Sequence, residues 1–314
     1  MQLVRGLSAL PGTEGGSVLT IGAFDGLHLG HQALIARAGE EATRHRRPAL
    51  LLTFEPMPRE FLSPSDPPAR LTSLRERWRI LGGSRVSYLW LLRFGEALRN
   101  LSAGEFADLL VRAARARHVV VGHDFRFARN GEATAPVLAA AGERLGFAVE
   151  VLSPVMLDGE RISSSGVRGA LARGEFARAQ RWLGRAYSMR GRVIPGKRLG
   201  HELGFPTANL ALARRRAPVG GIFAVRVYGA APGVQAGVAS LGTRPTIGGV
   251  EALLEAHLFD FSADLYGREI EVEFVAKLRE ERCFETLEAL AAQMRRDAEE
   301  AREILAGGAA TAER

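Results

Sequence analysis

The sequence predicts an α/β domain built on a doubly wound parallel sheet, followed by an antiparallel β-barrel that ends in a helix. Three observations carry this prediction. The chain has 314 residues, more than an ordinary single domain requires. Its first half alternates β-rich and helical segments, which is typical of a parallel sheet with crossover helices. Its second half contains short alternating β segments without such helices, which is typical of an antiparallel barrel.

The first half supplies the strands and helices of the parallel sheet. Strands are predicted at residues 18–21, 49–54, 86–92, 118–122 and 148–152. Helices are predicted at residues 32–44, 73–81, 103–116 and 135–145. Because the strands of a parallel sheet all end at the same edge, this pattern places ligands at the carboxyl ends of the strands.

The second half has a different pattern, which begins after two short helical stretches between residues 165 and 184. Strands are predicted at residues 189–194, 222–228, 234–241, 253–259 and 270–275, and a helix at 286–305. The change of pattern places the domain boundary near residue 186. We therefore expect domains at residues 1–186 and 187–308, with a short tail at 309–314.

Composition excludes several classes of protein. With 46% hydrophobic and 25% charged residues, the chain resembles soluble globular proteins, and it contains no apolar run long enough to cross a bilayer. A start without a signal-peptide pattern and a single cysteine, Cys283, predict a cytoplasmic location. The net charge of +7 raises nucleic-acid binding as an alternative. However, the basic clusters at 44–47 and 214–216 lack interleaved aromatic residues, so they are expected to be solvated.

The most informative segment runs from Gly22 to His31, between the strand predicted at 18–21 and the helix predicted at 32–44. Glycines let backbone amides approach an anion, and the start of a helix favours negative charge, so the turn is expected to bind a nucleoside triphosphate. His28 and His31 are spaced to share a helix face, where they can stabilise charge on a phosphorus centre. The alternative is an ordinary βα turn with two surface histidines, which the HxGH spacing after FDG disfavours.

The string GAFDGLHLGH resembles the HxGH signature of nucleotidylyltransferases, in the form found in prokaryotic bifunctional riboflavin kinase/FAD synthetases. Residues 119–127 and 161–168 resemble two further motifs of that family, VGxDFRFG and ISSTxIR. The resemblance implies a Rossmann-like nucleotidylyltransferase domain, in which the FMN phosphate attacks the α-phosphorus of ATP and pyrophosphate leaves. Taken alone, serines before a helix are more often a simple N-cap. The occurrence of three motifs in the family's order is much more specific.

The resemblance also implies roles for individual residues. His28 and His31 would act in catalysis by stabilising the α-phosphate, and Asp124 would orient the ribose or the flavin phosphate. The other ATP contacts implied for this domain are Gly22, Phe24, Asp25, Gly30, Ser164, Ser165 and Arg168, the last three for the β- and γ-phosphates. Two positions depart from the family pattern: Met57 stands where a histidine is usual, and Ala128 where a glycine is usual. We expect these departures to slow FAD synthesis relative to the kinase step.

The segment from Gly191 to Leu210 is not a Walker A loop, and it resembles the riboflavin kinase motif that ends in GFPTAN. The resemblance implies phosphate contacts at Gly196, Lys197, Gly200, Gly204 and Pro206, and Mg²⁺ ligands at Thr207 and Asn209. Neutral oxygens beside phosphates suit Mg²⁺, which takes few protein ligands. Without the preceding glycines, PTAN would be interpreted equally well as a turn.

Glu255 matches the glutamate of the family and is assigned to catalysis. It would accept the proton of the ribityl 5′-hydroxyl as that oxygen attacks the γ-phosphorus of ATP. Alternation along the strand places Glu255, His257 and Phe259 on one face. The resemblance also places Arg279 and Phe284 beside the flavin. Taken alone, Glu255 would be interpreted as an exposed strand glutamate.

Together the two motif sets predict a bifunctional enzyme that phosphorylates riboflavin to FMN in its second domain and adenylylates FMN to FAD in its first. Both steps would use ATP with Mg²⁺. The partners would be the small molecules riboflavin, FMN and ATP, with no nucleic acid and no membrane, and the oligomeric state is left open. A transferase for a different phosphate would explain only the first half, and a nucleic-acid binder would explain only the charge.

Overall fold

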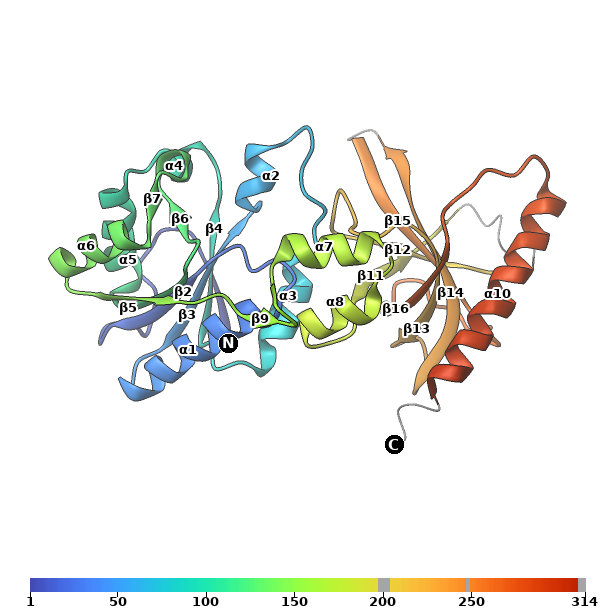
Figure 1. The fold of residues 1–314 in the computed structure, drawn as a ribbon, viewed down its shortest axis with the longest axis horizontal. Coiled ribbons are helices and arrows are strands. Elements are labelled where there is room, and N and C mark those ends of the chain that lie inside the picture. Colours follow the sequence, from blue (N-terminus) through green and yellow to red (C-terminus); the bar gives the residue numbers. More distant parts are fainter. Residues whose placement is uncertain (197–203, 247–248, 310–314) are drawn as a thin grey trace. The chain divides into compact units, whose positions relative to one another are not determined.

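The computed structural model describes residues 1–196, 204–246 and 249–309 (Figure 1). Its contacts divide the chain into two compact units, each described here by itself. The first unit consists of Met1–Pro68 and Arg77–Ser163, and the second of Ala69–Glu76 and Ser164–Arg314. Contacts thus group residues 69–76 and 164–186 with the barrel, whereas the sequence pattern grouped them with the sheet. The domain limits 1–186 and 187–308 stay a prediction.

The first unit is built on a sheet of six parallel strands in the order β1-β4-β3-β2-β5-β8. The strands are β1 (Gln2–Arg5), β2 (Ser17–Ile21), β3 (Ala49–Glu55), β4 (Tyr88–Arg93), β5 (Ala116–Gly122) and β8 (Ala148–Leu152). The helices around them are α1 (Leu29–Arg44), α2 (Pro58–Leu62), α3 (Leu74–Ile80), α4 (Glu96–Arg99), α5 (Ala103–Ala114) and α6 (Ala135–Leu145). Two short strands, β6 (Arg126–Phe127) and β7 (Ala133–Thr134), form a separate hairpin.

Helices cover both faces of this sheet, because successive strand residues point to opposite sides. Val18 of β2 and Val120 of β5 pack against Ala38 and Ala42 of α1. Leu19, which faces the other side, belongs to a separate cluster that includes the buried residues of α5 and α6. The predicted doubly wound parallel sheet is therefore confirmed.

The strand order fixes where a ligand can bind in this unit. From β2 the chain continues to β3 and β4 on one side of the sheet, then returns to β5 and β8 on the other side. Doubly wound sheets bind ligands at such a reversal, outside the carboxyl ends of the two neighbouring strands. Here those strands are β2 and β5, which end at Ile21 and Gly122. The Gly22–His31 turn and the loop that carries Asp124 therefore extend from neighbouring strands at the reversal point.

The second unit contains a closed barrel with the strand order β11-β12-β15-β14-β13-β16, in which every pairing is antiparallel. The strands are β11 (Ser188–Ile194), β12 (Ala208–Ala211), β13 (Gly221–Tyr228), β14 (Val234–Thr246), β15 (Gly249–Leu258) and β16 (Glu269–Arg279). Helices α7 (Ser164–Ala172) and α8 (Phe176–Leu183) precede the barrel, and α10 (Leu287–Ala309) follows it (Figure 1). Ala301 and Leu305 of α10 pack on Ala224 and Phe259. The predicted barrel with its terminal helix is confirmed.

Two strands of these sheets are absent from the sequence prediction. β1 is a short edge strand, largely exposed, and two of its four residues are Gln2 and Arg5. β12 begins directly after the PT of the GFPTAN segment and has only four residues. Neither strand contains enough alternating apolar residues to be predicted from the sequence. β1 is identified by its pairing with β4, and β12 by its pairing with β11 and β15.

Residues 69–76 are held in the second unit by a buried ion pair between Glu76 and Arg214. Arg214 Nη2 donates to the two carboxylate oxygens of Glu76, at 2.7 and 2.5 Å. Glu76 Oε1 also accepts a hydrogen bond from the backbone amide of Arg190, at 2.8 Å. The expectation that the basic cluster 214–216 is solvated is therefore wrong for Arg214, because its partner is distant in the sequence and no local pattern indicates it.

Arg214→Met should destabilise the barrel unit by about 3–5 kcal/mol, because it leaves the Glu76 carboxylate buried without its cationic partner. The matched control is Arg215→Met, one residue along the chain and exposed, which should change stability by less than about 0.5 kcal/mol. Hydrogen exchange of the β13 and β16 amides measures the free energy of opening of this unit. Equal protection in the two variants would contradict the role assigned to the ion pair.

Candidate active sites

The turn that follows β2 is a buried and tightly curved stretch of backbone. Phe24, Gly26 and Leu27 have positive φ angles of 50°, 84° and 46°. Of these residues only glycine adopts such a conformation without strain, and strained backbone concentrates at functional sites. The side chains of Phe24 and Leu27 are fully buried, and Asp25 between them is buried as well. Packing therefore holds the turn in this shape, against the intrinsic preference of two of its residues.

His28 and His31 lie together at the beginning of α1. His28 is the N-cap residue, and its Nδ1 accepts a hydrogen bond from the backbone amide of His31 at 3.3 Å. The two rings are stacked, with centroids 3.7 Å apart and planes at 19°. Because Nδ1 of His28 is an acceptor, a neutral ring carries its proton on Nε2, where it can donate to a phosphate oxygen. The expectation that the two histidines share a face is confirmed.

Two glycines of the turn lie beside its aromatic rings, and only Gly30 is in a tight contact. A Cβ atom at Gly30 would lie 3.1 Å from Cε1 of His28, and one at Gly22 would lie 3.4 Å from the ring of Phe24. The Gly22 amide also donates to the Leu52 carbonyl of β3, at 3.1 Å. The structure thus gives both glycines a part in shaping the turn, while their contacts with ATP stay a prediction.

Arg77 is a functional candidate that the sequence analysis missed. Its buried guanidinium donates from Nη1 to the Ala23 carbonyl at 2.9 Å and to the Thr53 hydroxyl at 3.0 Å. Nη2 donates to Glu55 Oε2 at 2.9 Å. One side chain therefore ties the turn to the carboxyl end of β3, which makes Arg77 a positioning residue for the histidine pair. No local motif marks it, because its partners lie 22 to 54 residues away.

Asp124 lies in the loop after β5, the strand that neighbours β2. It forms an ion pair with Arg161. Burial raises the pKa of the Asp124 carboxyl, but the hydrogen bond and the charge of Arg161 outweigh it, so the pKa lies below its usual value. Asp124 is therefore a carboxylate at neutral pH, with its charge already balanced by a neighbouring guanidinium. Its predicted role in orienting the ribose or the flavin phosphate stays a prediction.

The two departures from the family pattern have different structural consequences. Met57 is buried at the beginning of α2, so it packs where a histidine would offer a polar ring. Ala128 has φ 66° and ψ −174°, a conformation that only glycine adopts without strain. The chain thus keeps the backbone geometry of a glycine at position 128 while carrying a side chain there.

Ala128→Gly should stabilise the first unit by about 1 kcal/mol, because relief of the positive φ exceeds the extra chain entropy of glycine. The control is Ala103→Gly in the first turn of α5, where φ is helical and glycine should destabilise by up to about 1 kcal/mol. Urea unfolding of the two variants and the parent chain measures the difference. A loss of stability in Ala128→Gly would show that the side chain contributes more by packing than it costs in strain.

Ser164, Ser165 and Arg168 all lie on α7, in the second unit, with Ser164 as the first residue of the helix. Arg168 Nε donates to the carbonyl of Ala69 at 2.6 Å, so this side chain also holds the segment 69–76. The contacts of these three residues with the β- and γ-phosphates of ATP stay a prediction.

The barrel brings together several residues of the predicted kinase site. Asn209 on β12 lies directly opposite Glu255 on β15, and residues opposite each other on antiparallel strands share a face. Asn209 is buried and Glu255 is half-buried. Gly196 lies against Asn209, where a Cβ would come within 2.4 to 2.7 Å of the carboxamide atoms. This glycine is therefore required, because any side chain would displace the carboxamide.

His257 is a second residue that the list of predicted site residues missed. Its Nδ1 lies 2.9 Å from the carbonyl oxygen of Pro206, and its ring meets Phe205 edge to face at 5.1 Å. Glu255 and His257 are both half-buried and alternate with buried core residues, so the expectation that they share a face is confirmed. His257 thus holds the GFPTAN segment against the strand that carries Glu255.

The other residues predicted for the kinase site divide into three groups. Arg279 and Phe284 lie together, with the guanidinium carbon 5.7 Å from the ring centroid, and Arg279 is also ion-paired with Asp297 of α10 at 2.7 Å. Gly204 has a positive φ of 84°, and Thr207 directly precedes β12. Lys197 and Gly200 lie outside the described residues.

Comparison with known proteins identifies both halves of the chain. The family model described as FAD synthetase matches residues 11–166, and the one described as riboflavin kinase matches residues 183–305. The bifunctional riboflavin kinase/FMN adenylyltransferase of Pseudomonas fluorescens is 45% identical over 98% of this chain and 99% of its own length. The protein of the same description from Escherichia coli K12 is 43% identical over 97% of this chain and 98% of its own.

A solved structure has the same fold throughout. The crystal structure described as a macrolide-efflux protein from Streptococcus pneumoniae matches with a TM-score of 0.78 and 30% identity, over 96% of this chain and 98% of that one. In the part of this chain that the structure describes, none of the helices is long and apolar enough to cross a membrane. Since the curated relatives match from end to end and each family model falls on its own motif set, the chain belongs to the bifunctional riboflavin kinase/FMN adenylyltransferases, with the FAD synthetase domain first and the riboflavin kinase domain second.

Proposed function

We propose that this chain phosphorylates riboflavin at the β12–β15 face of the barrel and adenylylates FMN at the Gly22–His31 turn. The observation that carries the proposal is the pairing of the predicted groups within each unit: the stacked histidines at the N-terminus of α1, and Asn209 opposite Glu255. A transferase for a different phosphate acceptor would need only the first pair. The second pair favours an enzyme with two ATP sites.

In the first unit, adenylyl transfer proceeds by direct attack of an FMN phosphate oxygen on the α-phosphorus of ATP. The bond from the α-phosphorus to the bridging oxygen breaks, and pyrophosphate leaves, so no covalent enzyme intermediate forms. His28 donates from Nε2 to an α-phosphate oxygen, where the N-terminal dipole of α1 also favours negative charge. Asp124 orients the acceptor, and the contacts of Ser164, Ser165 and Arg168 with the departing phosphates stay a prediction from the sequence. Alignment and charge stabilisation account for the catalysis.

In the second unit, Glu255 accepts the proton of the ribityl 5′-hydroxyl as its oxygen attacks the γ-phosphorus of ATP. The bond to the bridging oxygen of ADP breaks, which leaves FMN and ADP. Asn209 and Gly196 place the phosphates next to Glu255. Asn209 lies opposite Glu255 on the neighbouring strand, and Gly196 lies against the Asn209 side chain. Arg279 and Phe284 border the flavin.

The families that this chain matches use ATP and generally need a divalent metal. We assign Mg²⁺, with Thr207 and Asn209 as its protein ligands in the barrel. The donor set supports the assignment, because Mg²⁺ accepts a hydroxyl and a carboxamide oxygen beside phosphates as ligands. Neither Thr207 nor Asn209 offers a sulfur or imidazole ligand that would favour a different metal. When bound, the ion neutralises charge on the ATP phosphates. The single and exposed Cys283 supports a reducing, cytoplasmic location for these reactions.

A product assay tests the proposed function. The purified chain is incubated with riboflavin, ATP and Mg²⁺, and the flavins are separated over time. We expect FMN to appear first and FAD to follow, with one pyrophosphate released per FAD. FAD from added FMN without any FMN from riboflavin would support a transferase with an inactive barrel, and neither product would exclude the proposal.

Met57→His should raise the rate of FMN adenylylation without changing riboflavin phosphorylation. Histidine can donate a hydrogen bond and carry charge, whereas the methionine thioether can do neither. Met57→Leu is the matched control, since it preserves an apolar side chain of similar volume and should leave both rates as they are. The initial rate of FAD formation from FMN and ATP decides the outcome. An equal rate in the His and Leu variants would mean that the departure at position 57 has no catalytic effect.

A further inference from the structure

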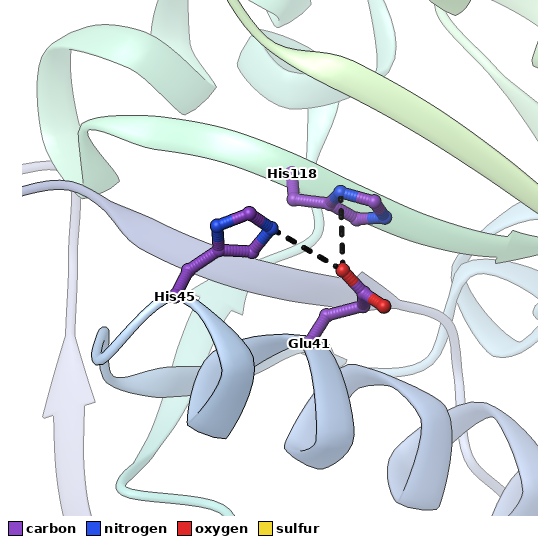
Figure 2. Close-up of side chains that lie close together, drawn as sticks. All are labelled: Glu41, His45 and His118. Atoms are coloured by element: carbon purple, nitrogen blue, oxygen red, sulfur yellow. Dashed lines mark ion pairs between the residues drawn. The ribbon is translucent and has the colours of Figure 1, made fainter.

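Two histidines and a buried glutamate form a cluster at the end of α1 away from the Gly22–His31 turn (Figure 2). Glu41 lies on α1, His45 caps the C-terminus of that helix, and His118 lies on β5. Glu41 Oε2 is 3.4 Å from Nε2 of His45 and 4.0 Å from Nδ1 of His118. All three potential ligand atoms lie within 4.8 Å of one another. The proposed catalytic steps use none of these side chains.

The spacing of these atoms is close to that of a metal site. Tetrahedral zinc with bonds of about 2.0–2.1 Å holds its ligand atoms about 3.3 Å apart. Because no two of these atoms are more than 4.8 Å apart, the cluster exceeds that spacing by at most about 1.5 Å, a difference that rotation of a side chain can remove. His45 is the side chain most able to rotate, because it is 38% exposed, whereas Glu41 is only 1% exposed. The buried carboxylate thus provides a fixed ligand, and His45 a movable one.

His118 is oriented as a metal-binding histidine would be. Its Nε2 lies 3.2 Å from Oε2 of Glu150, on the neighbouring strand β8. This contact favours the tautomer with the proton on Nε2, which leaves the lone pair of Nδ1 on the side of Glu41. Histidines that bind metals almost always donate their other ring N–H to such an outer carboxylate. Glu150 therefore supplies the second shell that a metal ligand needs.

Both oxygens of Glu41 contact guanidinium groups, and the contact to Oε2 comes from the more exposed side chain. Arg37 contacts Oε1 of Glu41 at 2.5 Å and Glu150 at 2.7 Å, so it bridges the two carboxylates. Arg44 contacts the other oxygen, Oε2, also at 2.5 Å, from a side chain that is 64% exposed. A cation at this position has to displace only Arg44, which can turn into water.

We propose that Glu41, His45 and His118 bind a divalent transition-metal ion of the zinc class, with Glu150 orienting His118 and water completing the coordination. Two imidazole nitrogens suit zinc, copper or nickel and not Mg²⁺, so this site is distinct from the metal that accompanies ATP. It lies about 15 Å along α1 from His31, since each helical residue advances 1.5 Å. The ion would tie the end of α1 to β5, which is a structural role.

Zinc binding is tested with the full-length chain, by competition between the protein and a chromophoric chelator for Zn²⁺. The parent for this experiment carries His28→Gln, His31→Gln and Cys283→Ser, because the stacked histidines and the exposed thiol are alternative ligands. We expect one Zn²⁺ per chain, with affinity that falls as pH is lowered and protons compete for the imidazoles. His45→Gln and His118→Gln should each weaken binding by at least about tenfold. His123→Gln, which removes a histidine outside the cluster, should leave it unchanged.

Arg44→Gln separates a metal site from a purely structural ion-pair network. If zinc displaces Arg44, removing that guanidinium should tighten zinc binding. Zn²⁺ should also raise the melting temperature of the parent and of Arg44→Gln, and raise that of His45→Gln by less at the same zinc concentration. Weaker binding in Arg44→Gln, no saturable site in the parent, or equal binding with and without His45 would each overturn the proposal. Should His118→Gln fail to fold, His45→Gln still decides the result, because His45 lies at an exposed helix end.

Discussion

Replacing both His28 and His31 with glutamine should abolish the formation of FAD from FMN and ATP while riboflavin phosphorylation continues at nearly its original rate. Loss of one donor to the charge that develops in the transition state lowers a rate by about 10²–10³-fold. The rings are stacked at one helix N-terminus, so we expect the double replacement to lower the rate by at least about a thousandfold. Glutamine keeps a hydrogen-bonding group at the N-cap position of α1. The loss would therefore report on catalysis more than on folding.

The two steps are measured separately, with FMN supplied for the first unit and riboflavin for the second. His45→Gln is the matched control, because His45 caps the opposite end of α1 and lies outside the pair. It should preserve both activities. Loss of both activities in a folded double variant would show that the two reactions share a site, and retention of FAD synthesis would remove the histidines from the mechanism.

Arg77→Met should also slow FAD formation from FMN and ATP, by a smaller factor. Arg77 is a residue that sequence reasoning could not find. The HxGH spacing predicts the histidine pair because both rings lie within one helical turn. The guanidinium that fixes the turn comes from a different helix, and its three partners lie on β3 and in the turn itself. The periodicity of the local sequence does not predict such a contact. Sequence reasoning also missed the contact of His257 on β15 with Pro206, because the two residues lie 51 positions apart.

The fold was predictable to the extent that its elements are long and regular. The β segments that became β2, β3, β4 and β5 predicted the buried cores of those strands, because parallel strands covered on both faces are almost continuously apolar. β2 and β3 show this, with every residue but Glu55 buried. The exposed edge strand β1 and the short β12 have no such signature. The contacts that group residues 69–76 with the barrel, among them the Glu76–Arg214 ion pair and the Arg168–Ala69 hydrogen bond, join distant parts of the sequence and leave no change in local composition.

Glu255→Gln should lower the rate of riboflavin phosphorylation by about 10²–10⁴-fold, the contribution of a general base to such a step. FAD formation from added FMN should stay unchanged. Glutamine has nearly the shape of glutamate, so the cross-strand position opposite Asn209 and the barrel itself should be preserved. Because a general base must be deprotonated to accept the ribityl proton, the parent enzyme should lose kcat/KM at low pH. The variant should lack this acid limb.

The acid limb distinguishes a base from a residue that only shapes the site. A structural role would lower the rate by a similar factor at every pH, and it would weaken ATP binding together with turnover. Glu273→Gln provides the comparison, since Glu273 is a half-buried glutamate of the same barrel, paired with Arg226 at 3.1 Å on the neighbouring strand. Its replacement should cost stability but leave the pH profile of the kinase step intact. If both glutamine variants kept the acid limb, another group would have to accept the proton, and the half-buried His257 beside Glu255 on the same strand face would be the next candidate.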